Sequence, residues 1–179
     1  MYNNPATFDI EKLEWMNGEY VRAMSSDEFR SIALPQVEED LRRALEDEEL
    51  ESFVEIAPLV QERTKLLTEV VPQVRFLFTD VDSYDQKSWD KVMTKDGVGS
   101  ILDAAADRLE TVEPWAPEPI EGALRGLLAE MEIGVGKGLQ PMRVAVTGSS
   151  VSPPLFESMS ALGRDRTIGR LRSARARLD

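Results

Sequence analysis

The sequence contains no cysteine and no histidine among its 179 residues. Without cysteine, disulfide bonds, thiolate zinc sites and cysteine nucleophiles are excluded, and the chain needs no oxidising compartment. Without histidine, the commonest general base near neutral pH and the commonest transition-metal ligand are missing. Any catalysis by this chain would therefore depend on carboxylates, lysine, serine or tyrosine.

Long apolar runs are also missing. No stretch approaches the roughly 18 to 20 apolar residues that a membrane-spanning helix needs. The first residues lack the basic-then-apolar pattern of a secretory leader. With 42% hydrophobic and 30% charged residues, the composition is that of a globular chain with one substantial core or two small ones. We therefore expect a cytoplasmic protein without a membrane partner.

Positive charge is scarce, since 21 lysine and arginine residues are set against 33 acidic ones, for a net charge of −12. This balance ordinarily argues against a nucleic-acid partner, because phosphate binding depends on basic side chains that displace counterions. The charge is unevenly distributed, however. Residues 38–51 carry eight acidic and two basic side chains, whereas residues 161–178 carry six arginines and one aspartate. The arginine-rich stretch either pairs with acidic neighbours on a solvated helix or meets phosphate.

Helical periodicity runs through most of the chain. Asp9 is a predicted helix cap, and Ser25 with Glu28 predicts a capping box at the start of the next helix. Pro35 is expected to interrupt that helix. Apolar residues then recur every three or four positions over 86–93, 98–112 and 118–131, and no hairpin turn is flanked by alternating residues. The pattern predicts an all-α fold.

A division near the middle is expected at the aspartate-rich segment 79–86, which contains no core-forming run. We expect a tail at 1–7, a first helical subdomain at 8–80 and a second at 81–179, with the two subdomains packed together.

The most informative segment is 143–164, which predicts a helix, a polar turn and a second short helix. Gly148 can adopt the left-handed conformation that closes a helix, and Gly163 can close the second one. Ser152 followed by Pro153 predicts a capping hydroxyl and a first helical residue that needs no amide partner. On these features alone an ordinary helical hairpin is the favoured description.

Catalytic patterns are incomplete. The glycine-rich segment 134–138 lacks a preceding strand and the spacing of either nucleotide-binding fingerprint, so it predicts a flexible connection or a helix start. Asp103 and Asp107 lie one helical turn apart and offer a weak divalent-ion site. The serines at 149, 150 and 152 have no histidine to activate them. Nothing amounts to an active site.

Four blocks of sequence carry a resemblance. The first is Phe8-Asp9-x-x-Lys12-Leu13-x-Trp15-Met16-Asn17-Gly18-x-Tyr20-x-Arg22, followed by residues 63–78 with the ending Arg75-Phe76-Leu77-Phe78, and by residues 127–138. The last is Pro141-x-Arg143-x-Ala145-x-Thr147-Gly148 with Ser152-Pro153-x-Leu155-Phe156-Glu157 and Leu162-Gly163. In this order they resemble the anticodon-binding region of bacterial glutamyl-tRNA synthetases over nearly the whole chain.

The resemblance implies an α-helix cage of two subdomains that recognises the anticodon loop of glutamate tRNA. It also implies a C-terminal piece of a longer class I ligase, which attaches glutamate to tRNA with ATP and Mg²⁺. The His-x-Gly-His and Lys-Met-Ser-Lys-Ser type motifs that hold ATP in this class are absent here. We therefore expect a monomeric, cofactor-free recognition module, with catalysis supplied in cis by a separate catalytic domain.

The family's anticodon contacts align with five positions. Arg63 matches the arginine that reads the third anticodon base, where a guanidinium suits the acceptor edge of cytosine. Its alternative role is pairing with a neighbouring glutamate on a helix surface. Ser152, Pro153 and Leu155 match the turn that lines the first base, and Arg143 either contacts phosphate or holds the turn in place.

Weaker candidates for contacts to the tRNA backbone are Lys12, Asn17, Arg22, Arg164 and Arg170. Trp15 is expected in the core. Arg63 favours discrimination between glutamate and glutamine tRNA without deciding it. Two other functions remain open, namely a helical protein-interaction scaffold with an exposed apolar groove and a carboxylate-metal helical enzyme.

Overall fold

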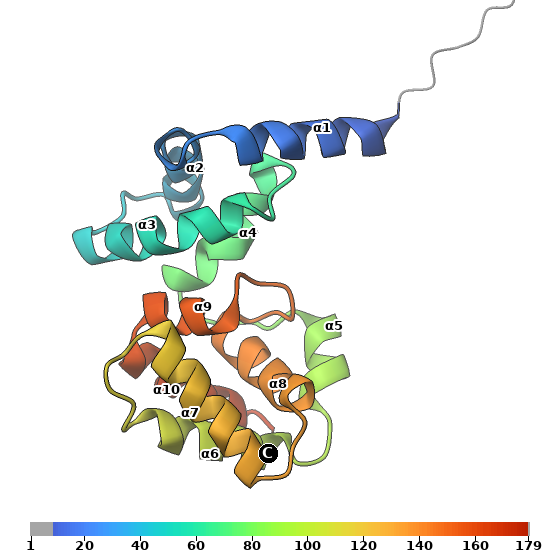
Figure 1. The fold of residues 1–179 in the computed structure, drawn as a ribbon, viewed down its shortest axis with the longest axis vertical. Coiled ribbons are helices and arrows are strands. Elements are labelled where there is room, and N and C mark those ends of the chain that lie inside the picture. Colours follow the sequence, from blue (N-terminus) through green and yellow to red (C-terminus); the bar gives the residue numbers. More distant parts are fainter. Residues whose placement is uncertain (1–8, 179) are drawn as a thin grey trace, which may run out of the picture.

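The computed structural model of the protein describes residues 9–178, so the predicted tail at 1–7 lies outside the described residues. Every regular element in the described part is helical, which confirms the all-α prediction. The upper group in Figure 1 contains α1 (Ile10–Ala23), α2 (Ser26–Leu41), α3 (Asp47–Gln61), η1 (Leu67–Glu69), α4 (Val70–Val74) and η2 (Arg75–Leu77). None of the described helices is long and apolar enough to cross a membrane.

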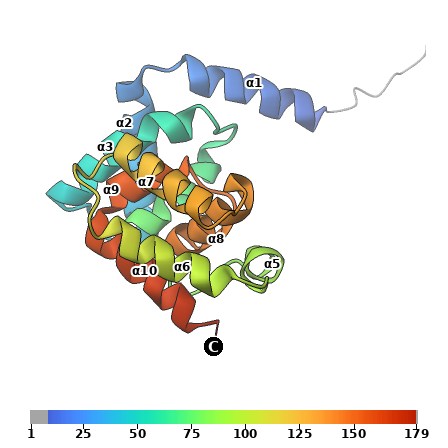
Figure 2. The same cartoon turned by 60° about the horizontal axis from the view of Figure 1, so that its bottom comes forward.

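The lower group follows a non-helical segment at 80–85. It contains α5 (Gln86–Ser88), the π-helical turn η3 (Trp89–Met93), α6 (Val98–Leu109), α7 (Pro117–Glu130), α8 (Val135–Thr147), α9 (Leu155–Leu162) and α10 (Arg164–Ala176). Seen after a 60° turn, α6 and α10 lie side by side below α7 and α8 (Figure 2). The proposed limits at 8–80 and 81–179 stay a prediction.

Two of the predicted helix starts are confirmed. The Asp9 side chain accepts a hydrogen bond from the Lys12 amide at 3.1 Å. Ser25 and Glu28 form the expected capping box. The predicted interruption at Pro35 is wrong, because α2 continues through it. Burial of one face of α2 outweighs the backbone hydrogen bond that a proline removes.

Helix α1 projects beyond the other helices at the top of Figure 1. Gln61 of α3 binds its C-terminal end, since Nε2 donates to the carbonyls of Val21 at 2.8 Å and Met24 at 2.9 Å. Trp15 is 60% exposed, so the expectation that it belongs to the core is wrong. No other described element covers the part of α1 that carries Trp15.

The two groups of helices are joined by direct contacts. Ser52 of α3 donates from its hydroxyl to the carbonyl of Ala161 in α9 at 2.9 Å. Arg166 of α10 donates to the carbonyl of Leu77 at 2.6 Å. These contacts place α9 and α10 against the first half of the chain.

Arg170 forms the most buried of these connections. It is 7% exposed, and its guanidinium donates to the carbonyls of Val146 at 2.7 Å, Phe76 at 2.8 Å and Thr79 at 2.8 Å. Burial and, to a smaller extent, the charge of Arg166 lower the pKa of Arg170 to about 10, yet the side chain stays protonated at neutral pH. One cation thus satisfies backbone acceptors from both halves of the chain.

The glycine-rich segment 134–138 begins α8, which confirms the predicted helix start. A Cβ at Gly138 would lie 2.2 Å from Cδ2 of Leu128 in α7. A glycine is therefore required for the close crossing of α7 and α8. At Gly136, by contrast, a Cβ would meet nothing within 4 Å.

Candidate nucleic-acid interface

The polar turn between α8 and α9 forms largely as the sequence predicts. Gly148 has φ 82° and ψ −6°, and its amide donates to the Val144 carbonyl at 2.8 Å, which closes α8. Gly163, with φ 87°, closes α9. The predicted capping role of Ser152 is wrong, because α9 begins at Leu155 after Pro154 and has no side-chain cap.

The Ser152 hydroxyl has a different partner. Arg143 of α8 donates from Nη1 to Oγ of Ser152 at 2.5 Å and to the carbonyl of Pro153 at 2.6 Å. The side chain that feeds the turn therefore holds it in shape, which is one of the two roles expected for Arg143. Ser152 and Pro153 are both buried by this arrangement.

Arg63 reaches the same turn from the other half of the chain. It lies just beyond α3, next to the buried Thr64, whose hydroxyl donates to the Val60 carbonyl at 2.8 Å. Nη1 of Arg63 donates to the Ser152 carbonyl at 3.3 Å, and Nη1 of Arg143 lies 3.5 Å from the same oxygen. Arg63, which is 89 residues away from Ser152 in the sequence, is thus brought together with Arg143, Ser152 and Pro153.

Two guanidinium groups around one carbonyl make this turn strongly positive. Burial lowers the pKa of Arg143, the charge of Arg63 lowers it further, and Glu157 acts in the opposite direction. Among the ion pairs of residues 9–178, none involves Arg63 or Arg143. Arg63 is exposed. The site can therefore offer donors and positive charge to an acceptor-rich ligand.

The far side of the turn is anchored to α5. The Asp85 amide donates to the Gly148 carbonyl at 2.8 Å, and the hydroxyls of Ser88 and Ser150 lie 2.9 Å apart. The Asp85 carboxylate accepts from the Ser88 hydroxyl at 2.6 Å and from the Ser88 amide at 2.8 Å. Both bonds hold the pKa of Asp85 below its ordinary value of 3.8. Sequence reasoning missed this anchor, although Asp85-x-x-Ser88 is a helix-capping pattern.

The apolar parts of the turn face in opposite directions. Leu155 is 3% exposed and packs in the core, and its predicted contribution to binding a base stays a prediction. Val151 at the tip of the turn is 77% exposed and was missed. The signal that could have found it is an apolar residue between two serines in a polar turn.

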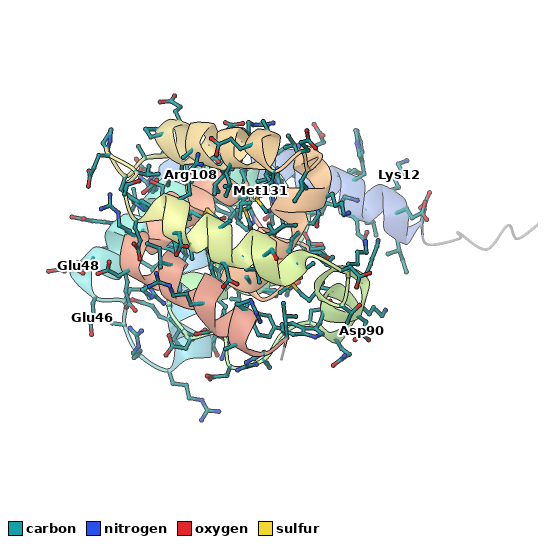
Figure 3. The ribbon with its side chains drawn as sticks, turned by 90° about the horizontal axis from the view of Figure 1, so that it is seen from below. Lys12, Glu46, Glu48, Asp90, Arg108 and Met131 are labelled. Atoms are coloured by element: carbon teal, nitrogen blue, oxygen red, sulfur yellow. The ribbon has the colours of Figure 1, made fainter. Side chains whose placement is uncertain are left out.

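The candidates on α1 lie apart from this turn. Lys12 is on the part of α1 that extends away from the other helices (Figure 3). Arg22 pairs with Glu19, and the Asn17 amide donates to the Lys65 carbonyl. Asn17 therefore holds α1 against the segment that follows Arg63. Whether these side chains touch RNA stays a prediction.

The candidates on α10 do not fit a phosphate contact. Arg170 is buried on three carbonyls, as described above. Arg164 donates to the Val112 carbonyl, pairs with Glu113 at 2.8 Å and lies over the Trp115 ring, 5.3 Å from its centroid. The alternative for the arginine-rich stretch, pairing with neighbouring groups, is thus the one that the structure favours for Arg164 and Arg170.

Asp103 and Asp107 likewise have protein partners. Arg175 lies 3.0 Å from the Asp103 carboxylate, and Arg172 lies 3.8 Å from Asp107. The part of the chain that the structure describes contains no group of three or more carboxylate, cysteine or histidine side chains that could hold a metal ion. The carboxylate-metal alternative has no geometric support.

Comparison with known proteins gives the same family as the sequence blocks. A model of the family described as "Anticodon binding domain" matches residues 28–175. A glutamate–tRNA ligase of Salinispora arenicola is 41% identical over 98% of this chain, which covers 39% of that protein. One from Dehalococcoides mccartyi is 41% identical over 97% of this chain, covering 36% of the relative. The chain thus spans well under half the length of these relatives.

Solved structures agree on the fold. A crystal structure of a glutamate tRNA ligase from Elizabethkingia meningosepticum superimposes with a TM-score of 0.81 over 96% of this chain and 33% of that one, at 22% identity. The similarity in sequence and in fold therefore extends over the described helices of both halves. From the match over residues 28–175, the chain belongs to the anticodon-binding domain family.

Proposed function

We propose that this chain reads the anticodon loop of glutamate tRNA and that Arg63 inspects the third anticodon base. The observation that carries the proposal is the convergence of Arg63 and Arg143 on the Ser152 carbonyl, at 3.3 and 3.5 Å. Anticodon bases are unstacked, so their hydrogen-bonding edges are accessible to side chains. A guanidinium donates to the acceptor edge of cytosine, whereas guanine at this place would be larger and would present donors.

The two arginines have different tasks in this proposal. Arg143 is partly buried and fixes the turn through Ser152 and Pro153, whereas Arg63 is exposed and has further N–H groups to offer to a base beyond its bond to the Ser152 carbonyl. Val151, which is 77% exposed at the tip, offers an apolar surface for an unstacked base. The turn therefore combines a fixed frame, one exposed donor and one apolar contact.

The chain itself binds and does not catalyse. It lacks the motifs that hold ATP in the class that it resembles, so ATP and Mg²⁺ belong to a catalytic domain outside this sequence. That domain lies in cis in a cytoplasmic glutamate–tRNA ligase, and the recognition module itself is monomeric and needs no cofactor. With a net charge of −12, its affinity for RNA depends on a few well-placed cations and falls as salt increases.

The test is a titration of the purified chain with two anticodon stem-loops that differ only at the third anticodon base, cytosine or guanine. We expect the cytosine loop to bind more tightly by about 1–3 kcal/mol, and Arg63→Ala to abolish the difference. Arg42→Gln is the control, because it removes one exposed positive charge elsewhere. Equal affinity for the two loops at several salt concentrations would refute the proposal.

A further inference from the structure

A cavity lies beside the polar turn between α8 and α9. Its volume is about 460 Å³, which is within the range of small-ligand sites, and Ser150 of the turn forms part of its wall. Ser150 is also the residue that the Ser88 hydroxyl binds, so the cavity and the turn share one anchored segment. A ligand in this cavity would lie beside whatever the turn binds.

The cavity is lined by three lysines, namely Lys91, Lys95 and Lys137. The whole chain has only six lysines. Across residues 9–178, none of these three takes part in an ion pair. One carboxylate, Asp96, also lines the cavity and partly offsets their charge. The net charge of the lining is still positive in a chain that is strongly acidic overall.

The acidic stretch lies elsewhere. Glu46 and Glu48, at the start of α3, lie at the opposite side of the molecule from the π-helical turn that carries Lys91, as the position of Asp90 in that turn shows in Figure 3. The positive charge of the cavity is therefore separated from the main concentration of negative charge. π-helical turns are rare and occur frequently at functional sites.

Two helices begin at the cavity and add to its attraction for anions. Val98 is the first residue of α6, and Gly136 and Lys137 lie in the first turn of α8. Both helices start after a glycine, and neither start has a side-chain cap. The Val98 amide already donates to the Lys95 carbonyl at 3.3 Å, but the positive ends of both helix dipoles still favour a phosphate next to the lysines.

The floor of the cavity is apolar. Val92, Val98 and Ile101 line it and are 7%, 4% and 2% exposed, so they are fixed parts of the core. A ligand that fits must combine an apolar or aromatic body with a negative group. A nucleotide has this composition, with a base or ribose for the floor and a phosphate for the lysines.

We propose that this cavity receives one nucleotide of the same RNA loop that the Arg63–Arg143 turn reads, with its phosphate held by Lys91, Lys95 and Lys137. The inference rests on the proposed function and adds a second contact site to it. It also gives a role to the glycine-rich segment 134–138, which is not a nucleotide-binding fingerprint but supplies Gly136 and Lys137 to the cavity wall. The bound phosphate belongs to a polynucleotide rather than to a free nucleotide.

The first experiment measures stem-loop affinity between 50 and 200 mM salt for the triple variant Lys91→Gln, Lys95→Gln, Lys137→Gln. We expect about tenfold weaker binding or more at the lower salt, and a salt slope reduced by about 0.7 for each lost phosphate contact. The preference for cytosine over guanine at the third base should persist. Lys87→Gln is the matched control, because Lys87 is an exposed lysine of α5 that does not line the cavity.

A second experiment changes no charge. Gly136→Trp places a large side chain at the cavity, where a Cβ meets nothing within 4 Å, and should weaken stem-loop binding at least tenfold without unfolding the chain. Gly122→Trp is the control, since Gly122 is an equally open glycine outside the cavity. Because the chain has no cysteine, Lys137→Cys can carry a photo-crosslinking group at a unique thiol. It should crosslink to the loop, and Lys87→Cys should not.

The outcomes separate the two proposals. If the unaltered chain prefers the cytosine loop while the cavity variants bind like their controls, the cavity proposal is wrong and the reading site stands. If uridine monophosphate binds the cavity but the stem-loop neither competes with it nor crosslinks there, a free nucleotide is the ligand and the proposal is also wrong. If the unaltered chain binds neither loop, both proposals are overturned.

Discussion

Replacing Arg170 with methionine should destabilise the chain strongly without acting through RNA. The methionine fills a similar volume but leaves the carbonyls of Phe76, Thr79 and Val146 without their donor. Three hydrogen bonds from a charged group contribute about 5 kcal/mol or more. Part of this is offset, because removing a buried charge also removes its desolvation cost.

The size of this offset follows from the pKa of Arg170, which burial and, to a smaller extent, the charge of Arg166 lower from 12.5 to about 10. At about 1.4 kcal/mol for each pKa unit, roughly 3 kcal/mol is regained when the charge is removed. The net loss of unfolding free energy is therefore about 2–5 kcal/mol, in line with the cost of breaking a buried charged network. For a chain of this length it corresponds to a melting temperature lowered by about 5–15 °C.

Urea unfolding followed by circular dichroism measures this loss. Arg172→Met is the matched control, because Arg172 lies on the same helix but its side chain is 54% exposed. Its ion pairs with Asp107 and Glu110 are at the surface, and such pairs contribute little to the free energy of unfolding. Arg170→Lys should give an intermediate loss, since an ammonium group keeps the charge but cannot reach three carbonyls. If Arg170→Met unfolds at the same urea concentration as Arg172→Met but binds the stem-loop more weakly, Arg170 contacts phosphate and our reasoning is wrong.

Three further predictions concern stability. Gly138→Ala should lower the free energy of unfolding in urea by about 1–3 kcal/mol, because its methyl group overlaps Leu128 of α7. Gly122→Ala, at an open helical position, should instead stabilise the chain by up to about 1 kcal/mol. Equal effects of the two substitutions would refute the requirement for glycine at the crossing of α7 and α8. Gln61→Leu should cost about 1–3 kcal/mol by leaving two carbonyls at the end of α1 without a donor, and an unchanged midpoint would contradict this. The hydrogen bonds from Ser88 lower the pKa of Asp85 in the folded chain. Their contribution to the free energy of unfolding is therefore complete above the ordinary Asp85 pKa of 3.8, and it is lost as the pH falls through the lower pKa of the folded state. Ser88→Ala should therefore flatten the loss of stability below pH 4 in acid titrations, and an unaltered acid limb would argue against the anchor.

The sequence predicted where helices begin and end better than it predicted which helices pack against one another. Capping chemistry is local, so Asp9, Ser25 with Glu28, and Gly148 were identified from a few neighbouring residues. The predictions that Pro35 interrupts its helix and that Trp15 lies in the core were wrong because neither outcome is local. Their outcome depends on which other helix packs there, and helical periodicity does not contain that information.

The candidate site shows the same limit. The resemblance to glutamyl-tRNA synthetases aligned Arg63, Arg143 and Ser152 with anticodon-binding positions, and the structure places these three residues together. The exposure of Val151 and the burial of Leu155 depend on the direction in which the turn faces, which follows from tertiary packing. The arginines of α10 could not be assigned from charge alone, because a backbone carbonyl that captures Arg170 leaves no trace in the composition.

The shared carbonyl of Ser152 has a consequence for errors in decoding. Arg63 comes from the first half of the chain, whereas Arg143 and Ser152 both belong to the second, so a slip of about 1 Å between the halves would break the 3.3 Å contact of Arg63 while leaving each half folded. A substitution far from the turn, such as one at the Ser52 to Ala161 bond, could therefore yield a thermally robust protein that misreads its codon family. If the chain reads an anticodon as proposed, fidelity and thermal resistance are separable properties, and screening variants by melting temperature alone would overlook the inaccurate ones.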